Sequence, residues 1–250
     1  MRIDLTGRTA LVTGGNSGIG AAVSVALGKA HAKVVTTYLS VPEIPAGLVE
    51  SGNCAGTFQM DARDSDRVDH VVGKAAALLD GHIDILINNA GSLVGRKTIP
   101  EMTNAFWHDV LDVNLTSAFY CTRAALPFMN RGFGRIVHMS SQAASDGGGP
   151  GAVAYSASKA GVSGLTRGLA KELGPQGITV NAIAPGLIQN TKLHNTFTKP
   201  EVQKEIISRI PIGRGGRPDD VAGAVVFLVS HFGEFVSGEV IELNGGIFFS

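Results

Sequence analysis

Short apolar runs alternate with longer amphipathic stretches along the whole chain. The β-prone runs predict strands at residues 9–13, 33–38, 57–60, 83–87, 134–141, 178–186 and 239–243. Helical periodicity predicts helices at residues 21–30, 64–79, 103–126, 154–173 and 218–230. This alternation predicts a single α/β domain over residues 1–250, with a doubly wound parallel sheet and helices on both of its faces.

Two stretches depart from this alternation. Residues 39–56 contain Pro42 and Pro45, which argue against a full helix, so we expect a short irregular crossover there. Residues 187–212 have weaker periodicity and an internal proline, Pro200. We expect this second stretch to form a mobile lid with one or two short helices.

The first strand runs directly into the turn Gly14-Gly15-Asn16-Ser17-Gly18-Ile19-Gly20. In a strand–turn–helix context Gly14 permits a tight turn, Gly18 lets the backbone approach a pyrophosphate, and Gly20 lets the helix pack close to the strand. The helix N-terminus adds free N–H groups and a positive dipole end. The turn therefore predicts a Rossmann-type dinucleotide site, although such turns also occur for packing alone.

The end of the second strand bears on the choice of cofactor. A carboxylate there would bind the ribose 2′-hydroxyl of NAD and repel the 2′-phosphate of NADP. Residues 37–40 include Thr37 and Tyr38 but no acid. This weakly favours NADP, although no arginine at Asn16, Ser17 or Tyr38 offers the phosphate a partner.

Polar and small residues follow several predicted strands. Asp61, Asn88, Ser141 and Pro185-Gly186 join the glycine turn at predicted carboxyl ends. Ligands of doubly wound sheets bind beyond these ends, so the signals converge on one edge of the sheet. Asp64 and Asp66 are better explained as capping the helix over 64–79, and the turn after Asn88 could be an ordinary loop.

Tyr155 and Lys159 share one face of the helix over 154–173 because they are four residues apart. At about 4 Å and an effective dielectric of about 20, an ammonium would stabilise a phenolate by roughly 4 kcal/mol. This would lower the phenol pKa by about three units, toward neutrality. The alternative is a packed tyrosine and a solvated lysine. Asn114, inside the helix over 103–126, is either functional or a satisfied buried amide.

Composition limits the other possibilities. The 250 residues include 21 basic and 21 acidic side chains, so no bulk charge attracts nucleic acid or an anionic membrane. Cys54 and Cys121 have no metal-ligand or redox spacing, and none of the seven histidines pairs at metal-ligand spacing. We expect no metal, no signal segment and no membrane span, hence a soluble cytoplasmic protein. His138 is expected to pack, and His194 either packs or touches substrate.

Charge is uneven in one region only. Residues 186–217 contain six basic and two acidic residues. An anionic substrate or an acyl-carrier partner would fit this excess, and so would a solvated lid. The helices around Asn114 and after Tyr155 are expected to have apolar outer faces. These faces predict a homo-oligomer, either a dimer or a homotetramer.

Taken in order, these motifs resemble the short-chain dehydrogenase/reductase family, in its 3-oxoacyl-reductase-like branch of about 250 residues. The resemblance covers Leu5 to Gly246 and rests on Thr13-Gly14-x-x-x-Gly18-x-Gly20, Asn88-Asn89-Ala90-Gly91, Asn114, Ser141, Tyr155-x-x-x-Lys159 and Pro185-Gly186. Glycine spacing and chain length argue against the longer epimerase/dehydratase branch. The close spacing of the tyrosine and lysine argues against the enoyl-reductase variant.

The resemblance implies roles for matching residues. Tyr155 would be the acid in reduction and the base in oxidation, Lys159 would hold the nicotinamide ribose, and Ser141 would bind the substrate oxygen. Asn114 would hold a water that passes protons inward. The resemblance implies that NAD(P) is bound by Gly14, Asn16, Ser17, Gly18, Ile19, Gly20, Thr37, Tyr38, Asp61, Ala62, Asn88, Ala90, Gly91, Tyr155, Lys159, Pro185, Gly186, Ile188 and Thr191.

Three features depart from the family pattern. The spacing between Ser141 and Tyr155 is one residue longer than is usual in the family, so Ser140 stays a candidate. The crossover after the second strand contains prolines, and Asn244 stands where many relatives carry aspartate.

The expected function is an NAD(P)-dependent oxidoreductase that interconverts a small-molecule ketone or aldehyde and a secondary alcohol. The alternatives are a ketoreductase acting on carrier-bound 3-oxoacyl substrates and a catalytically silent NAD(P)-binding regulator.

Overall fold

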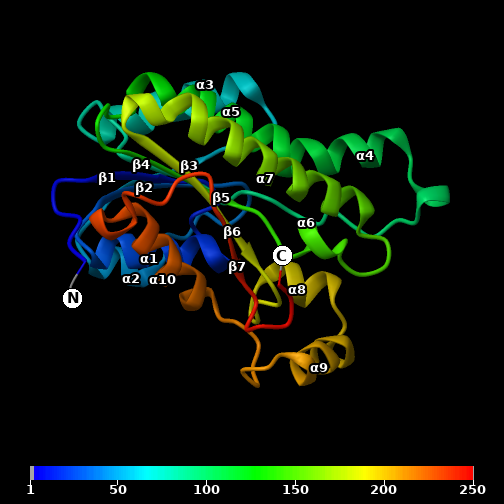
Figure 1. The fold of residues 1–250 in the computed structure, drawn as a ribbon. Coiled ribbons are helices and arrows are strands. Elements are labelled where there is room, and N and C mark those ends of the chain that lie inside the picture. Colours follow the sequence, from blue (N-terminus) through cyan, green and yellow to red (C-terminus); the bar gives the residue numbers. More distant parts are fainter. Residues whose placement is uncertain (1–2, 250) are drawn as a thin grey trace.

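A computed structural model describes residues 3–249 of the chain. Within these residues seven parallel strands form one sheet, and helices cover both of its faces (Figure 1). The strands are β1 (Thr9–Val12), β2 (Lys33–Tyr38), β3 (Cys54–Gln59), β4 (Ile85–Asn88), β5 (Gly134–Met139), β6 (Ile178–Pro185) and β7 (Val240–Leu243). The doubly wound parallel architecture predicted from the sequence is confirmed.

The helices between the strands occupy most of the predicted ranges. The α-helices are α1 (Gly18–Lys29), α2 (Ala46–Glu50), α3 (Ser65–Leu78), α4 (Asn104–Leu111), α5 (Ser117–Ala125), α6 (Ala143–Asp146), α7 (Val153–Leu173), α8 (Lys192–Phe197), α9 (Pro200–Arg209) and α10 (Pro218–Val229). Short 3-10 turns lie at Ile99–Glu101, Leu126–Phe128, Gly174–Gln176 and His231–Gly233. The segment 187–212, for which we predicted a lid, holds α8 and α9; its role as a lid stays a prediction.

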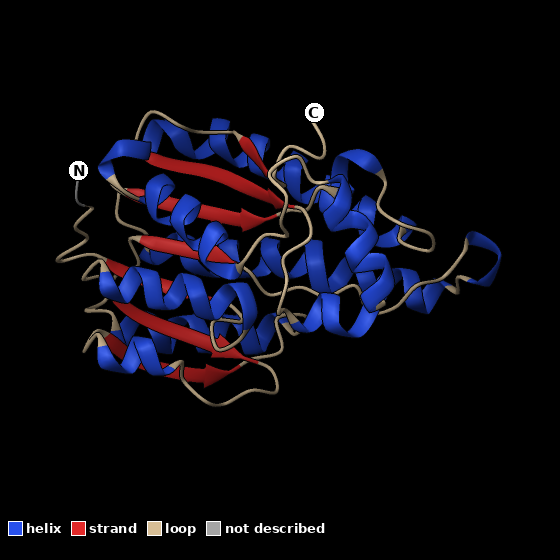
Figure 2. Cartoon of the chain, turned by 90° about the horizontal axis from the view of Figure 1, so that it is seen from below, coloured by secondary structure: helices blue, strands red, loops and turns tan. Residues whose placement is uncertain are grey.

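The strand order is β3-β2-β1-β4-β5-β6-β7. Since β1 pairs with both β2 and β4, the chain reverses its direction of winding between β1 and β4. In Figure 2 the strands run in the same direction, so their carboxyl ends meet at one edge. A doubly wound sheet has its ligand crevice at this reversal, beyond the carboxyl ends.

The two faces of the sheet have separate cores. Ala10, Val12 and Ile85 lie in the core beneath α1 and α10, whereas Leu11 and Leu86 lie in the core beneath α3, α5 and α7. Neighbouring residues of a strand point to opposite faces. Because both faces are covered, the central strands are continuous apolar runs instead of alternating ones.

Element ends differ from the prediction where tertiary pairing outweighs local preference. β3 begins at Cys54 instead of Thr57, because pairing with β2 extends the strand through small residues of weak β preference. β4 begins at Ile85, and Ile83 forms only an isolated bridge with Met129. The irregular crossover contains the short helix α2, consistent with the absence of a full helix there.

Local polar contacts decide two helix boundaries. The Asp64 carboxylate accepts a hydrogen bond from the Arg67 backbone N–H at 3.0 Å, so the predicted cap of α3 is confirmed. The single helix predicted over 103–126 divides into α4, a π turn at Asp112–Thr116 and α5. Asn114 lies inside the π turn, where its side chain bonds to the backbone of a neighbouring loop.

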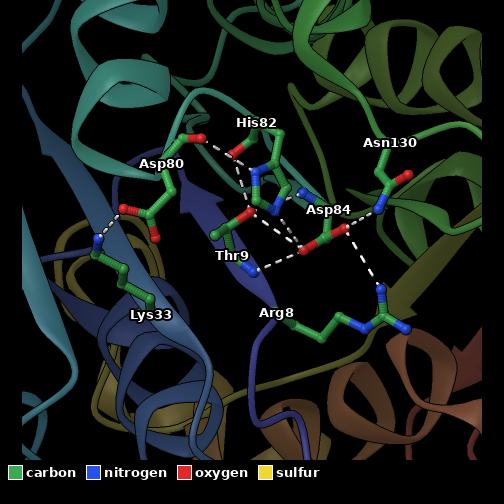
Figure 3. A network of polar contacts seen from close by, with 7 residues as sticks. All are labelled: Arg8, Thr9, Lys33, Asp80, His82, Asp84 and Asn130. Atoms are coloured by element: carbon green, nitrogen blue, oxygen red, sulfur yellow. Dashed lines mark hydrogen bonds and ion pairs between the residues drawn. The ribbon is translucent and has the colours of Figure 1, made fainter.

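A buried carboxylate joins the start of β1 to the segment that leads into β4, at the amino ends of these strands (Figure 3). Asp84 is fully buried and accepts hydrogen bonds from the Thr9 backbone N–H and the Asn130 amide, both at 3.0 Å. Arg8 Nη1 lies 3.6 Å and His82 Nε2 3.4 Å from its two oxygens. These contacts fix the start of β1 against the segment that leads into β4.

We predict that Asp84→Asn lowers the free energy of unfolding by about 3 kcal/mol, because the new amide places N–H groups against Thr9 and leaves Arg8 without a carboxylate. The matched control is Asp80→Asn, which removes an exposed ion pair with Lys33 and should cost less than about 1 kcal/mol. Urea denaturation measures both values. Equal decreases in the free energy of unfolding would show that the Asp84 network stabilises the fold no more than the exposed ion pair does.

Candidate active site

Tyr155 and Lys159 lie on one face of α7, near its start. Lys159 is only 4% exposed, and its Nζ lies 5.7 Å from the centroid of the Tyr155 ring. The ammonium donates a 2.8 Å hydrogen bond to the Met139 carbonyl, at the carboxyl end of β5. The predicted i, i+4 pairing is therefore present, and the lysine is buried instead of solvated.

The prediction that Lys159 lowers the pKa of the Tyr155 phenol is wrong. Burial raises the pKa of Tyr155 above its ordinary value, and a hydrogen bond with Ser141 opposes this shift without overcoming it. Burial also lowers the pKa of Lys159 to about 8. The prediction counted the Coulomb attraction but left out desolvation, and the ammonium bonds to Met139 instead of to the phenol oxygen.

The structure separates the two candidate serines, which lie just beyond the end of β5. Ser141 contributes a hydrogen bond that acts on the Tyr155 hydroxyl, so these two side chains lie together. The predicted contact of Ser141 with a substrate oxygen stays a prediction. Ser140 is 4% exposed, and its hydroxyl bonds to the Lys159 carbonyl at 3.1 Å and to the Ser163 hydroxyl at 3.0 Å. The extra residue between Ser141 and Tyr155 is thus accommodated, and Ser140 packs in the interior.

Asn114 reaches this group from the π turn between α4 and α5. Its Nδ2 donates to the Ser92 carbonyl at 2.7 Å, and its Oδ1 accepts from the Ser92 N–H at 3.1 Å. A β-carbon added to Gly91 would lie 2.8 Å from Asn114 Oδ1 and 3.2 Å from Lys159 Nζ. Asn114 and Lys159 therefore flank Gly91, where only glycine leaves both side chains in place. A π turn within a helix is frequent at functional sites.

The glycine turn has the shape that a diphosphate requires. Gly14 and Gly18 have φ angles of 62° and 53°, in the left-handed region that glycine favours. A β-carbon on Gly20 would collide with the Gly14 carbonyl, so the start of α1 packs directly on the turn. The space next to Gly18 is open, because the nearest atom to a β-carbon added there would be the Thr191 methyl, at 3.9 Å. The turn, the N-terminus of α1 and Thr191 thus fit a dinucleotide phosphate.

Several predicted cofactor residues have side chains that bond to the protein instead. Asn16 Nδ2 donates to the Val41 carbonyl at 3.1 Å, and Asn16 Oδ1 accepts from Thr36 at 2.6 Å, so this amide holds the crossover after β2. The Thr37 hydroxyl accepts a hydrogen bond from the Gly14 N–H. Asp61 pairs with Arg63 at 2.7 Å, which lowers the pKa of the Asp61 carboxyl. Any cofactor contact of Asn16 would be made by its backbone.

Asn88 also turns away from the crevice. Its Nδ2 donates to the Thr122 hydroxyl at 2.9 Å and contacts His138 Nδ1 at 3.2 Å. His138 is fully buried, as predicted, and burial lowers its pKa to about 4, with the Lys159 charge acting in the same direction. Asn88 Oδ1 and His138 Nε2 have no partner among the described residues. A cofactor contact of the Asn88 side chain stays a prediction.

The neighbouring Asn89 was part of the motif quoted from the sequence, but its role in holding the glycine turn was not predicted. Asn89 Nδ2 donates to the carbonyls of Thr13 and Gly14 at 2.9 and 3.2 Å. Its backbone N–H and that of Ala90 both bond to the Thr13 hydroxyl at 3.0 Å. These contacts join the end of β4 to the glycine turn and so set the position of Ala90 and Gly91. The paired asparagines were visible in the sequence, but not which of them faces the turn.

Residues at the carboxyl end of β6 complete the edge. A β-carbon on Gly186 would lie 2.8 Å from Gln142 Oε1 and 2.9 Å from the Asn244 β-carbon, so the chain passes closely between α6 and the end of β7. Pro185 and Ile188 are buried beside it. His194, on α8, bonds to the Gly186 backbone, and burial lowers its pKa to about 4. Thr191 caps α8 by accepting from the His194 N–H.

In residues 3–249 no three His, Cys, Asp or Glu side chains come together as metal ligands would. None of the helices in this range combines the length and the apolar character that crossing a bilayer requires.

Comparison with known proteins gives a consistent picture. Residues 14–248 match the family model described as enoyl-(acyl carrier protein) reductase. A 3-oxoacyl-[acyl-carrier-protein] reductase of Aquifex aeolicus is 38% identical over 99% of this chain and 100% of its own length. An acetoacetyl-CoA reductase of Rhizobium meliloti is 41% identical over 97% of this chain and 99% of its own length.

Solved structures agree with these relatives. A dehydrogenase/reductase from Sinorhizobium meliloti superposes with a TM-score of 0.91 at 35% identity, covering 99% of this chain and 98% of that one. A short chain dehydrogenase from Burkholderia cenocepacia in complex with NADP gives a TM-score of 0.90 at 35% identity, covering 99% of both chains.

The buried lysine makes stability depend on pH. Its pKa of about 8 in the folded chain lies below the value of about 10.4 in the unfolded chain. Between these values the unfolded state keeps a proton that the folded state has lost, so the free energy of unfolding rises with pH. We predict a rise of about 1.5 kcal/mol between pH 8 and pH 9.5 that Lys159→Met abolishes.

Urea denaturation across this pH range measures the effect. The matched control is Lys171→Met, which removes an exposed ammonium from the same helix and should leave the slope of the parent protein unchanged. A Lys159→Met protein with the parent's slope would contradict the assignment of a buried, charged lysine.

Proposed function

Because the chain belongs to the short-chain dehydrogenase/reductase family, as an NAD(P)-dependent oxidoreductase that interconverts a ketone and a secondary alcohol, we propose that it reduces 3-oxoacyl thioesters with NADPH. The observation that carries the proposal is the grouping of Tyr155, Lys159 and Ser141 at the carboxyl edge of the sheet, where Lys159 Nζ lies 5.7 Å from the centroid of the Tyr155 ring. The ketoreductase names of the relatives support the substrate class. The spacing Tyr155-x-x-x-Lys159 favours ketoreduction over the enoyl reduction that the family model's description mentions.

In this mechanism the protein holds the ketone and delivers a proton. The nicotinamide cofactor supplies the hydride to the carbonyl carbon when it is bound. Ser141 donates a hydrogen bond to the carbonyl oxygen, and the Tyr155 hydroxyl transfers its proton to that oxygen to form the alcohol. Because burial raises the pKa of Tyr155, the phenol remains protonated until the substrate oxygen accepts the proton.

Lys159 and Asn114 support this proton transfer from the inner side. The Lys159 ammonium stabilises the phenolate that forms, and its position on α7, beside the end of β5, suits a hydrogen bond to the nicotinamide ribose. Asn114, across Gly91 from Lys159, is placed to order a water that restores the proton. Pro185, Gly186, Ile188 and Thr191 would line the nicotinamide side, and the turn Gly14–Gly20 would hold the diphosphate.

We predict that Tyr155→Phe lowers kcat by about 10³-fold or more, because it removes the proton donor while leaving the ring in place. NADPH binding, followed by cofactor fluorescence, should change little. The matched control is Tyr120→Phe, which removes a hydroxyl from α5 and should keep at least half of the activity. Reduction of acetoacetyl-CoA, measured as loss of NADPH absorbance, tests both. A fully active Tyr155→Phe enzyme would exclude the assigned acid.

The preference for NADPH rests on the end of β2. Thr37 and Tyr38 close this strand, and residues 37–40 contain no carboxylate that would repel a 2′-phosphate. The relative from Burkholderia cenocepacia holds NADP in its crystal structure, which supports the same choice. Tyr38 is the position where a ribose-binding acid of an NAD enzyme would stand.

We predict that calorimetry finds tighter binding of NADPH than of NADH, and that Tyr38→Asp shifts the ratio of the two affinities toward NADH by about tenfold or more. Tyr38→Phe is the control and should keep the parent's ratio. Tighter binding of NADH by the parent protein would overturn the preference.

A homo-oligomer, either a dimer or a tetramer, is also part of the proposal. Phe119 on α5 is 44% exposed and Val153 at the start of α7 is 45% exposed. Large apolar side chains on the outer faces of these helices support association through that side of the molecule.

A further inference from the structure

Arg96 joins three segments that are far apart in the sequence. It lies in the loop that follows β4, and its Nε donates to the Phe197 carbonyl at the end of α8, at 3.2 Å. Its Nη1 donates to the Pro150 carbonyl at 3.0 Å, in the glycine-rich bridge that leads to α7. A β-carbon on Gly151 would lie 3.0 Å from the Arg96 β-carbon, so the loop is seated directly on the bridge.

All three segments adjoin the proposed catalytic residues. The loop begins at Gly91, between Asn114 and Lys159. The bridge connects Ser141 to Tyr155 along the chain. α8 carries His194, which bonds to the Gly186 backbone and whose ring lies close enough to Arg96 for that charge to lower its pKa. The guanidinium therefore lies where substrate-side segments meet, on the outer side of the catalytic group.

The bonding capacity of this guanidinium is largely unused. Arginine has five N–H donors, and the two hydrogen bonds of Arg96 go to neutral carbonyl oxygens. In the described residues no carboxylate lies within ion-pairing distance of it, whereas Arg63 and Arg214 pair with Asp61 and Asp220. Arg96 is exposed, so a ligand can reach it.

Charge around Arg96 favours an anionic ligand. Exposed Lys97 follows it in the loop, exposed Lys192 is the first residue of α8, and exposed Lys199 lies just beyond that helix. A guanidinium binds phosphate or carboxylate oxygens in a bidentate manner and more strongly than it binds a carbonyl. An arriving anion can therefore replace the carbonyl of Phe197 as the partner of Arg96, which frees the end of α8.

We propose that Arg96 recognises the phosphate of a 4′-phosphopantetheine arm that carries the 3-oxoacyl group. The inference rests on the proposed function, because a thioester has no free carboxylate and its nearest anionic group is the phosphate of the arm. Coenzyme A and an acyl carrier protein share this phosphate. Arg96 is then a specificity-determining residue: it favours phosphorylated carriers and couples their binding to release of α8.

Two synthetic substrates isolate the phosphate, the acetoacetyl thioesters of pantetheine and of 4′-phosphopantetheine. We expect the parent enzyme to show a kcat/KM about tenfold or more higher for the phosphorylated thioester. Arg96→Gln should bring this ratio close to one through a higher KM for the phosphorylated thioester, with kcat/KM for the pantetheine thioester within about twofold of the parent. The control Lys97→Gln removes an equal charge one residue away and should keep the ratio.

The other outcomes overturn the inference. An unchanged ratio in Arg96→Gln would place phosphate recognition elsewhere, and equal losses on both thioesters would show that Arg96 only holds the loop and α8 together. An equal loss of the ratio in Lys97→Gln would show general attraction by the positive region. Thermal unfolding of each variant checks that it is folded.

Two further experiments distinguish coenzyme A from an acyl carrier protein as the source of the phosphate, and the role of Arg96 from the proposed function. Acetoacetyl-CoA and an acetoacetyl acyl carrier protein distinguish the two carriers of the phosphate, and a stronger Arg96→Gln effect on one identifies that source. A parent enzyme that reduces a simple ketone but neither thioester would refute the proposed function itself. A parent enzyme that reduces both thioesters without distinguishing them would refute only the role of Arg96.

Discussion

The hydrogen bond from the Lys159 ammonium to the Met139 carbonyl, 2.8 Å long, is the contact on which the rest of the site depends. It holds the start of α7 against the carboxyl end of β5, and so brings Tyr155 within bonding reach of Ser141, which follows β5. Burying an ammonium is unfavourable, and the lowered pKa of Lys159 reflects that cost.

The amino ends of the strands carry contacts that stabilise the fold, and the carboxyl ends carry the residues of the proposed active site. At the amino ends, Asp84 has partners on all sides from Thr9, Asn130, Arg8 and His82, so its polar atoms are satisfied within the protein. At the carboxyl ends, the glycine turn leaves open space beside Gly18. Because the network at the amino ends holds the sheet together, the carboxyl ends can keep polar groups that only a ligand would satisfy.

Much of the fold and of the site followed from spacing alone, because glycine turns, strand length and the i, i+4 rule act locally. What spacing does not contain is the direction of each side chain. Asn16 and Asn88 stood at predicted ligand positions, yet both amides bond within the protein. The choice between Ser140 and Ser141 likewise needed the packing of α7 on β5. The sign of the Tyr155 pKa shift was wrong because burial depends on the whole fold.

Arg96 is a residue whose position near the proposed active site could not be predicted from local sequence patterns. The excess of positive charge over residues 186–217 was visible in the sequence, but Arg96 lies outside that range, and nothing local connects it to Pro150 or Phe197. Parallel strands bring the loops that follow them to one edge, so residues from three distant segments meet there. The fold thus creates a recognition position from a loop arginine, a bridge carbonyl and the end of a short helix. Because its present partners are neutral carbonyls, this position can exchange them for an anion without leaving a buried charge unpaired.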